Sequence, residues 1–158
     1  MLECSGKRVI KCYTMKIAAK PETIFPLLCP EREKEWIDGW TYEMIYSKSG
    51  FAELNCVWKS NLPNGGEAYW IMTKCVSPQE VEYVRFVPGL MIVNLLMQLK
   101  AQDSETTIIE RTDTFTGLCE QGNQAVDKIA QVMNETFRSL ETALNHFVTT
   151  GCLLKNRK

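Results

Sequence analysis

The sequence predicts an α+β fold, in which a curved antiparallel sheet of seven strands wraps around one long C-terminal helix. The first observation is the segment 123–150, whose apolar residues recur every three or four positions and form one wide stripe. The second is the region before it, where the apolar period changes to two and turn residues separate short strand patterns. A helix roughly 40 Å long needs a large apolar partner, so we expect it to lie across the sheet and enclose a pocket.

The elements follow one another in a simple order. Residues 9–17 are rich in β-branched and aromatic side chains and form a first strand pattern. Pro21 and Pro30 suit the first turn of a helix, which predicts two short helices over 21–28 and 30–36. Six more strand patterns follow, over 40–46, 51–59, 67–76, 80–87, 90–99 and 106–118. The joints between them are too short for parallel crossovers, so the sheet should be an antiparallel meander.

Length and charge limit the function classes. The 158 residues contain no linker or internal repeat, so we expect a single domain over residues 1–158. The 18 basic and 19 acidic residues give a net charge of −1, which argues against nucleic acid as a partner. No segment reaches the ~18 apolar residues of a membrane helix, and residues 1–8 lack the apolar stretch of a signal peptide. We therefore expect a cytoplasmic protein without stable membrane insertion, and the oligomeric state stays open.

The potential metal ligands are scattered. Seven cysteines stand at positions 4, 12, 29, 56, 75, 119 and 152 without a Cys-x-x-Cys pair, and His146 is the only histidine. We expect no metal and no cofactor, because a zinc site needs several such ligands at close spacing. The thiols should instead act as small apolar groups. His146 lies near the end of the long helix, where a histidine more often interacts with the helix terminus than takes part in catalysis.

Two strand patterns indicate which side chains face the helix. In 90–99 the odd positions are apolar and the other face carries polar residues. In 106–118, threonines at 112, 114 and 116 alternate as on a solvated face, which places Arg111 and Asp113 inward. A strand phase shifted by one residue would turn both charges outward. An inward pair must be hydrogen-bonded internally or meet a polar ligand group.

The order of strand, two short helices, six strands and long helix resembles the helix-grip fold of the SRPBCC superfamily, which includes START lipid-transfer domains, Bet v 1 pollen allergens and polyketide cyclase-like proteins. Within it, the segment 28–40, with the sequence LCPEREKEWIDGW, is similar to a functionally uncharacterised bacterial branch. The pair Gly122-Asn123, before the long helix, and residues 144–147, near its end, are also similar to that branch. The resemblance implies a deep cavity between the sheet and the long helix. It implies no particular activity, since functional residues in the superfamily vary with the ligand.

The segment 29–40 is the candidate mouth of such a cavity. Trp36 and Trp40 could supply flat apolar walls, and Arg32 could hold an anionic group. Cys29 would be reactive if Arg32 lowered its pKa. The alternative is structural, because tryptophans at a helix-to-strand corner usually pack that corner and the charges from 31 to 35 would form a solvated helical face.

The candidate ligand-binding residues combine aromatic, charged and flexible apolar side chains. They are Trp36, Trp40, Tyr42, Trp58, Trp70, Arg111, Asp113, Met133, Phe137 and Leu140. We expect Arg111 and Asp113 to orient the polar end of a ligand. The apolar members of the set would look the same if they were only core residues.

These observations favour a protein that binds or transports a small hydrophobic or amphipathic molecule. The alternative is an enzyme of cyclase or dehydratase type acting on a polyketide-like or aromatic molecule, with Asp113 as acid or base and a tyrosine assisting. A third possibility is an interaction module resembling the activators of the Hsp90 ATPase, although no exposed apolar run supports it. Ring hydroxylases of this fold hold iron with two histidines, and this chain has one.

Overall fold

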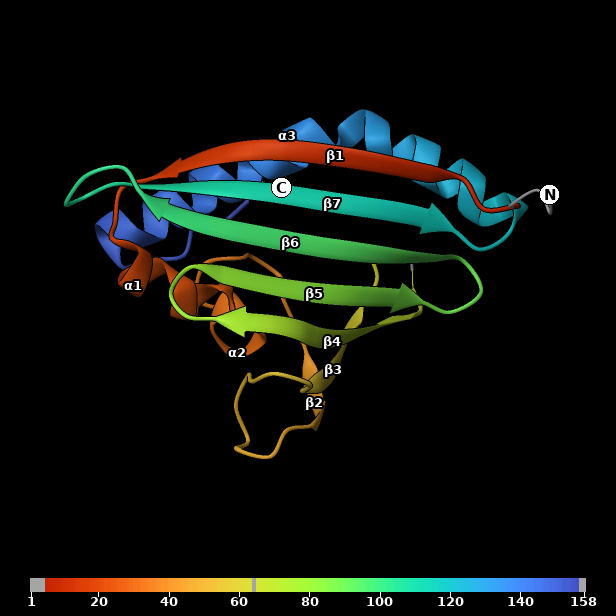
Figure 1. Ribbon diagram of the computed structural model, residues 1–158, viewed down its shortest axis with the longest axis horizontal. Coiled ribbons are helices and arrows are strands. Elements are labelled where there is room, and N and C mark those ends of the chain that lie inside the picture. Colours follow the sequence, from red (N-terminus) through yellow and green to blue (C-terminus); the bar gives the residue numbers. More distant parts are fainter. Residues whose placement is uncertain (1–4, 64, 157–158) are drawn as a thin grey trace.

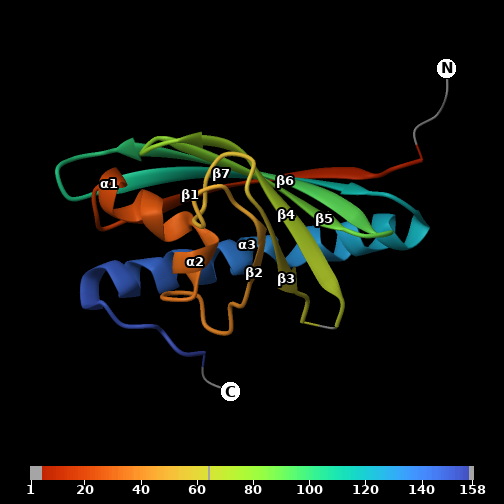
Figure 2. The ribbon, with the colours of Figure 1, turned by 90° about the horizontal axis from the view of Figure 1, so that it is seen from below.

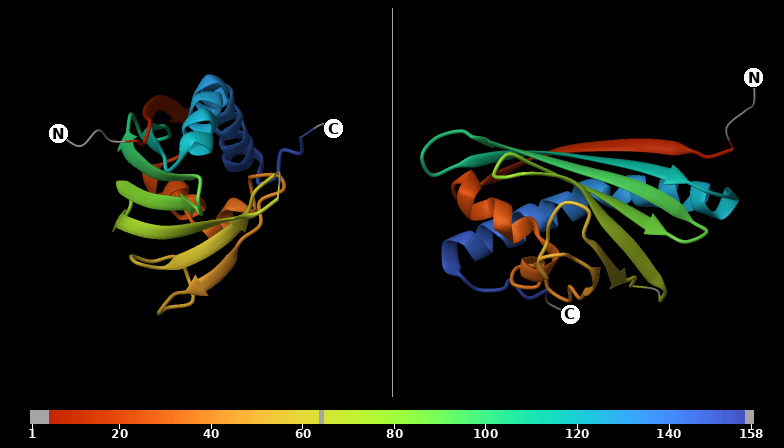
Figure 3. Two further views of the ribbon diagram at one scale, coloured as in Figure 1. Left: turned by 90° about the vertical axis from the view of Figure 1, so that its right-hand side faces the viewer. Right: turned by 60° about the horizontal axis from the view of Figure 1, so that its bottom comes forward.

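The computed structural model describes residues 5–63 and 65–156 of the chain. Its described strands form one antiparallel sheet in the order β1-β7-β6-β5-β4-β3-β2, so each strand pairs with its neighbour in sequence except β1, which pairs with β7. The long helix α3 crosses behind the sheet (Figure 1). The sheet curves, and α3 runs along its concave side (Figure 3). The expected architecture of a seven-stranded sheet around one long C-terminal helix is confirmed.

The strand bounds agree with the predicted ones within a few residues, except around β2 and β3. The strands are β1 (Arg8–Ile17), β2 (Glu43–Tyr46), β3 (Val57–Asn61), β4 (Glu67–Val76), β5 (Glu80–Val87), β6 (Met91–Ala101) and β7 (Thr107–Gly117). The predicted strands 40–46 and 51–59 were too long. The carboxylate of Glu53 accepts hydrogen bonds from the backbone amides of Lys48 and Ser49, and Asn55 has a φ of +67°. These contacts close a compact loop where an extended strand was expected.

Short helices fill the connection between β1 and β2, and both proline starts are confirmed. The predicted helix 21–28 divides into α1 (Pro21–Ile24) and a 3₁₀ turn, η1 (Phe25–Leu28). Pro26 has no amide hydrogen and therefore cannot continue the α-helical bonding of the first turn. The second helix, α2 (Pro30–Glu33), ends earlier than predicted. These turns and α3 lie on the same side of the sheet (Figure 2).

The core fills the space between the concave face of the sheet and α3. Residues of β6 alternate as predicted, with buried side chains at 91, 93, 95, 97 and 99. On β7, Ile109, Asp113 and Phe115 are at most 2% exposed, so the inward phase predicted for this strand is confirmed. From α3 the most buried side chains are Val126, Phe137 and Leu144. A charged residue is therefore built into an otherwise apolar layer.

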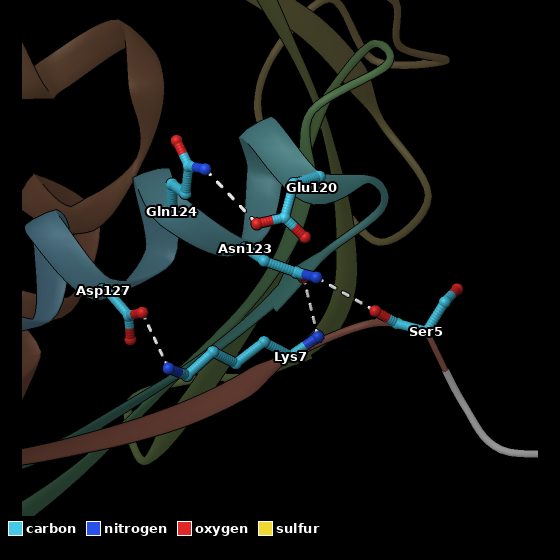
Figure 4. Close-up of polar contacts among 6 residues, drawn as sticks. All are labelled: Ser5, Lys7, Glu120, Asn123, Gln124 and Asp127. Carbon is cyan, nitrogen blue, oxygen red and sulfur yellow. Dashed lines mark hydrogen bonds and ion pairs between the residues drawn. The ribbon is translucent and has the colours of Figure 1, made fainter.

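The helix α3 (Glu120–Thr150) is anchored at its start by the segment just before β1 (Figure 4). The side-chain amide of Asn123 donates to the carbonyl of Ser5 and accepts from the amide of Lys7, at 3.0 and 2.8 Å. The ammonium group of Lys7 also pairs with Asp127 at 2.7 Å. The helix begins earlier than the apolar period predicted because the Cys119 thiol accepts a hydrogen bond from the Gly122 amide and caps it.

Exposed apolar side chains gather on β2 and the loop after it, at Ile45, Tyr46, Phe51 and Leu54, which corrects the expectation that no such group exists.

The six described cysteines are free, and Cys4 lies outside the described residues. Cys56 is buried as expected of a small apolar group, whereas the strand residues Cys12 and Cys75 are exposed. No helix within the described chain is long and apolar enough to cross a membrane.

Candidate functional site

A cavity of about 270 Å³ lies between the concave face of the sheet, α3 and the segment that follows α2. Its walls come from every layer of the fold. The lining residues are Glu33, Ile37, Trp40, Trp58, Trp70, Tyr83, Arg85, Leu95, Met97, Arg111, Thr136 and Leu140. Thr136 lines the cavity and is also exposed, so the cavity reaches solvent beside α3.

Aromatic rings form one wall of the cavity. Trp58 and Trp70 pair across β3 and β4, and their rings are stacked with centroids 5.8 Å apart. The rings of Trp40 and Tyr83 both meet Trp70 edge-on, at 6.1 and 6.5 Å. Strand alternation places the paired tryptophans on the same concave face. The result is a continuous aromatic wall, which suits an apolar or aromatic ligand.

Arg85 supplies the least compensated charge at this wall. It pairs with Trp70 across β4 and β5, and its guanidinium carbon lies 5.4 Å from the centre of the Trp70 ring. Its Nε is buried without a hydrogen-bond partner among the described residues, and burial lowers the pKa of the guanidinium. The indole nitrogen of Trp58 is buried without a described partner as well. Two buried hydrogen-bond donors of the aromatic wall therefore have no partner among the described residues.

Arg111, which lines the cavity, forms a salt bridge with Asp113, which does not. Nε and Nη2 of Arg111 donate to the two carboxylate oxygens of Asp113 at 2.9 and 3.0 Å. The two side chains are 13% and 2% exposed. The guanidinium of Arg111 also lies 4.9 Å from the centre of the Phe137 ring. Arg111 therefore reaches the cavity with its charge already balanced by Asp113.

Glu33, at the end of α2, adds a carboxyl group to the lining of the cavity. Burial raises the pKa of Glu33 from an ordinary 4.5 to about 8, although Arg111 acts in the opposite direction. The Glu33 carboxyl is therefore mostly protonated at neutral pH. Tyr83 donates its hydroxyl to the carbonyl of Leu28, and burial keeps the pKa of this phenol well above its usual range.

The structure places half of the expected ligand-binding residues at the cavity. Trp40, Trp58, Trp70, Arg111 and Leu140 line it, whereas Trp36, Tyr42, Asp113, Met133 and Phe137 do not. The indole of Trp36 donates to the carbonyl of Leu27 at 2.7 Å and packs the corner, as the structural alternative proposed. Tyr42 lies in a separate surface hollow with Glu43 and Lys59. Asp113, Met133 and Phe137 are buried behind the lining.

The structure contradicts the expected roles of Cys29 as a reactive thiol and of Arg32 as the holder of an anionic group at the cavity mouth. Arg32 binds both carboxylate oxygens of Glu35 at 2.9 Å and lies outside the cavity lining. Burial, with help from Glu31, raises the pKa of the Cys29 thiol to about 12. A thiol with this pKa stays protonated and is a poor nucleophile at neutral pH.

The two residues that give the cavity its polar character, Glu33 and Arg85, were missed. The signal for Arg85 was present, because it follows the same alternation as the buried Val81, Tyr83 and Val87 of β5. Apolar residues on the other face of β5, such as Phe86, obscured this alternation. Glu33 stands in a single helical turn, too short for a periodic signal.

Comparisons with known proteins identify the fold. No protein-family profile and no curated protein matches the sequence. An uncharacterised protein from Rhizobium leguminosarum superposes with a TM-score of 0.67 at 12% identity, over 90% of this chain and 97% of that one. Norcoclaurine synthase from Thalictrum flavum gives 0.67 at 10% identity, over 92% and 89%. A protein of unknown function from Enterococcus faecalis gives 0.60 at 18% identity, over 95% and 75%.

The chain has the Bet v 1-like fold. At identities of 10–18% the similarity shows the arrangement of sheet and helix alone. Function in a Bet v 1-like fold must therefore be argued from this chain's own lining.

Proposed function

We propose that this protein binds or transports a small hydrophobic or amphipathic molecule in the cavity between the sheet and α3. The observation that carries the proposal is the aromatic wall of Trp58, Trp70, Trp40 and Tyr83, which faces a space of about 270 Å³. Ligand sites are typically concave, mostly apolar and fitted with a few polar groups. This cavity has that composition.

The size of the cavity favours a molecule of one or two rings. Drug-sized ligands occupy pockets of roughly 300–1,000 Å³, and this one lies just below that range. Norcoclaurine synthase, which shares the fold, has been solved in complex with dopamine and hydroxybenzaldehyde, two single-ring aromatic compounds. A compact aromatic ligand is the corresponding expectation here.

Calorimetric titration with naphthalene-1-methanol tests the proposal. We expect 1:1 binding with a dissociation constant on the order of 10–100 µM, as for a neutral two-ring probe in an apolar pocket. Leu140→Trp would fill the cavity from α3 and weaken binding at least about tenfold. Leu118→Trp is the matched control, because Leu118 is 42% exposed and does not line the cavity. Equal binding by both variants would reject the proposal, and so would a wild type that binds neither this probe nor the corresponding acid, 1-naphthoate.

The second candidate is an enzyme that transfers a proton, and Glu33 is the observation that favours it. Asp113 was expected as the acid or base, but it is held by Arg111 and lies outside the lining. The raised pKa of Glu33 and its place in the lining suit a general acid near neutral pH. If the protein is a cyclase or dehydratase, Glu33→Gln will abolish turnover of an aromatic carbonyl substrate and keep naphthalene-1-methanol binding. A binding protein predicts no turnover by either form.

A further inference from the structure

The aromatic wall contains two hydrogen-bond donors that have no partner within the described chain. The indole nitrogen of Trp58 and Nε of Arg85 are both buried and lack a partner among the described residues, and both residues line the cavity. Trp58 is only 1% exposed. The other lining tryptophans are satisfied, since Trp40 donates to the carbonyl of Pro30 and Trp70 to the hydroxyl of Ser60. Unused buried donors are rare in native proteins, and each one calls for an explanation, of which a bound acceptor is one.

The charge balance of the cavity is positive at neutral pH. Four charged or titratable groups other than tyrosine face it or stand directly behind it: Glu33, Arg85, Arg111 and Asp113. Arg111 and Asp113 neutralise each other through two hydrogen bonds. Glu33 is mostly protonated, because burial raises its pKa to about 8. The guanidinium of Arg85 stays charged in proteins, so one positive charge remains.

Nothing within the described chain neutralises Arg85 directly. Its closest favourable partner is the face of Trp70, and Asp113, the acid that attracts it, has both oxygens bound to Arg111. Arg32, by contrast, is paired with Glu35. A buried guanidinium without a counter-ion is costly, and a complementary anion would offset that cost.

We propose that the ligand of this cavity is an aromatic monoanion, with its ring on the tryptophan wall and its carboxylate or similar oxyanion held by Arg85. The inference rests on the proposed binding function and specifies its ligand class. Arg85 lies against the face of Trp70, so the oxyanion and the ring of one small molecule would meet adjacent parts of the same wall. A cation would face an excess positive charge, and a purely apolar molecule would leave the charge of Arg85 uncompensated.

A pair of matched probes tests this inference in the full-length protein. 1-Naphthoate and naphthalene-1-methanol share their two rings, and only the first carries a charge. At pH 7 and low salt, we expect calorimetry to show that the wild type binds 1-naphthoate at least about tenfold more tightly, as for charge-assisted hydrogen bonds in a buried site. Arg85→Met should remove this preference, so that this variant binds the two probes within about threefold of each other.

Arg138→Met is the control, because it makes the same change of side chain and net charge at an exposed position of α3. It should keep the preference for the anion. If the wild type binds both probes equally, or prefers the alcohol, the anionic ligand class is wrong while the binding function stands. If it binds neither probe, the binding function itself fails and takes this inference with it. If Arg85→Met folds, as judged by circular dichroism, and still prefers 1-naphthoate, Arg85 is not the anion-binding group. The probe ratio of the wild type decides the ligand class even if that variant does not fold.

Discussion

Replacing Asp113 with valine would leave the guanidinium of Arg111 without its counter-ion. The pair is nearly excluded from water, with side chains 13% and 2% exposed, and both hydrogen bonds are lost together. Breaking a buried pair by removing one partner costs about 3–5 kcal/mol, and we expect this loss in the free energy of unfolding of Asp113→Val. Arg111→Met should cost a similar amount, because it strands the carboxylate and loses the contact with the Phe137 ring.

The double variant separates pairing from packing. With both charges gone, valine suits a β-strand and methionine fills the channel of the arginine stem, so we expect the double variant within about 2 kcal/mol of the wild type. Urea denaturation at pH 7, followed by circular dichroism, gives the four free energies of the cycle. A coupling of at least about 3 kcal/mol is predicted. If Asp113→Val alone costs less than about 1 kcal/mol, Arg111 is solvated through the cavity and the pair is not a buried one.

Three further predictions follow from the same structure. Burial raises the pKa of Glu33 to about 8, so the native state keeps a proton that the unfolded chain releases above about pH 4.5. The contribution of Glu33 to the free energy of unfolding therefore falls between about pH 5 and 8, by at most about 1.4 kcal/mol per pH unit, and is constant above pH 8. Urea denaturation of Glu33→Gln at several pH values should lack this slope. Arg85→Met should raise the free energy of unfolding of the ligand-free protein by about 1–2 kcal/mol, and a fall in its melting temperature would contradict an uncompensated charge. Gly122→Ala should destabilise by about 2–3 kcal/mol or more, because its Cβ would lie 1.9 Å from the backbone oxygen of Leu90; an unchanged urea midpoint would show that α3 can shift there.

The fold could be predicted because its signals extend over many residues. The apolar stripe of α3 repeats along a helix of 31 residues. In β6, buried and less buried side chains alternate from Met91 to Leu99. Such patterns depend on which face is buried, and burial dominates the energetics of folding. The same argument placed Arg111 and Asp113 inward, where the structure has them.

The site was harder to predict because it depends on contacts between elements. Periodicity assigned Phe137 to the interior, but it could not tell a residue at the cavity surface from one packed behind it. Trp36 was expected at the mouth of the cavity, and the sequence could not show that it packs the corner instead. Arg85 is unusual because no carboxylate of the described chain pairs with it. The sequence alone cannot show which buried groups lack a partner. Glu33 likewise becomes unusual only when the sheet and α3 enclose it.

The four tryptophans allow the most direct test of the claim that the cavity holds a small aromatic ligand. In a ¹H–¹⁵N spectrum each indole N–H gives its own signal, and Trp40, Trp58 and Trp70 line the cavity whereas Trp36 is packed in the corner outside it. On titration with 1-naphthoate, the account predicts saturable shifts of the Trp40, Trp58 and Trp70 indole signals, largest for Trp58, whose N–H has no described partner, and little change for Trp36. Unchanged signals of the three lining tryptophans, or equal shifts in all four, would contradict it.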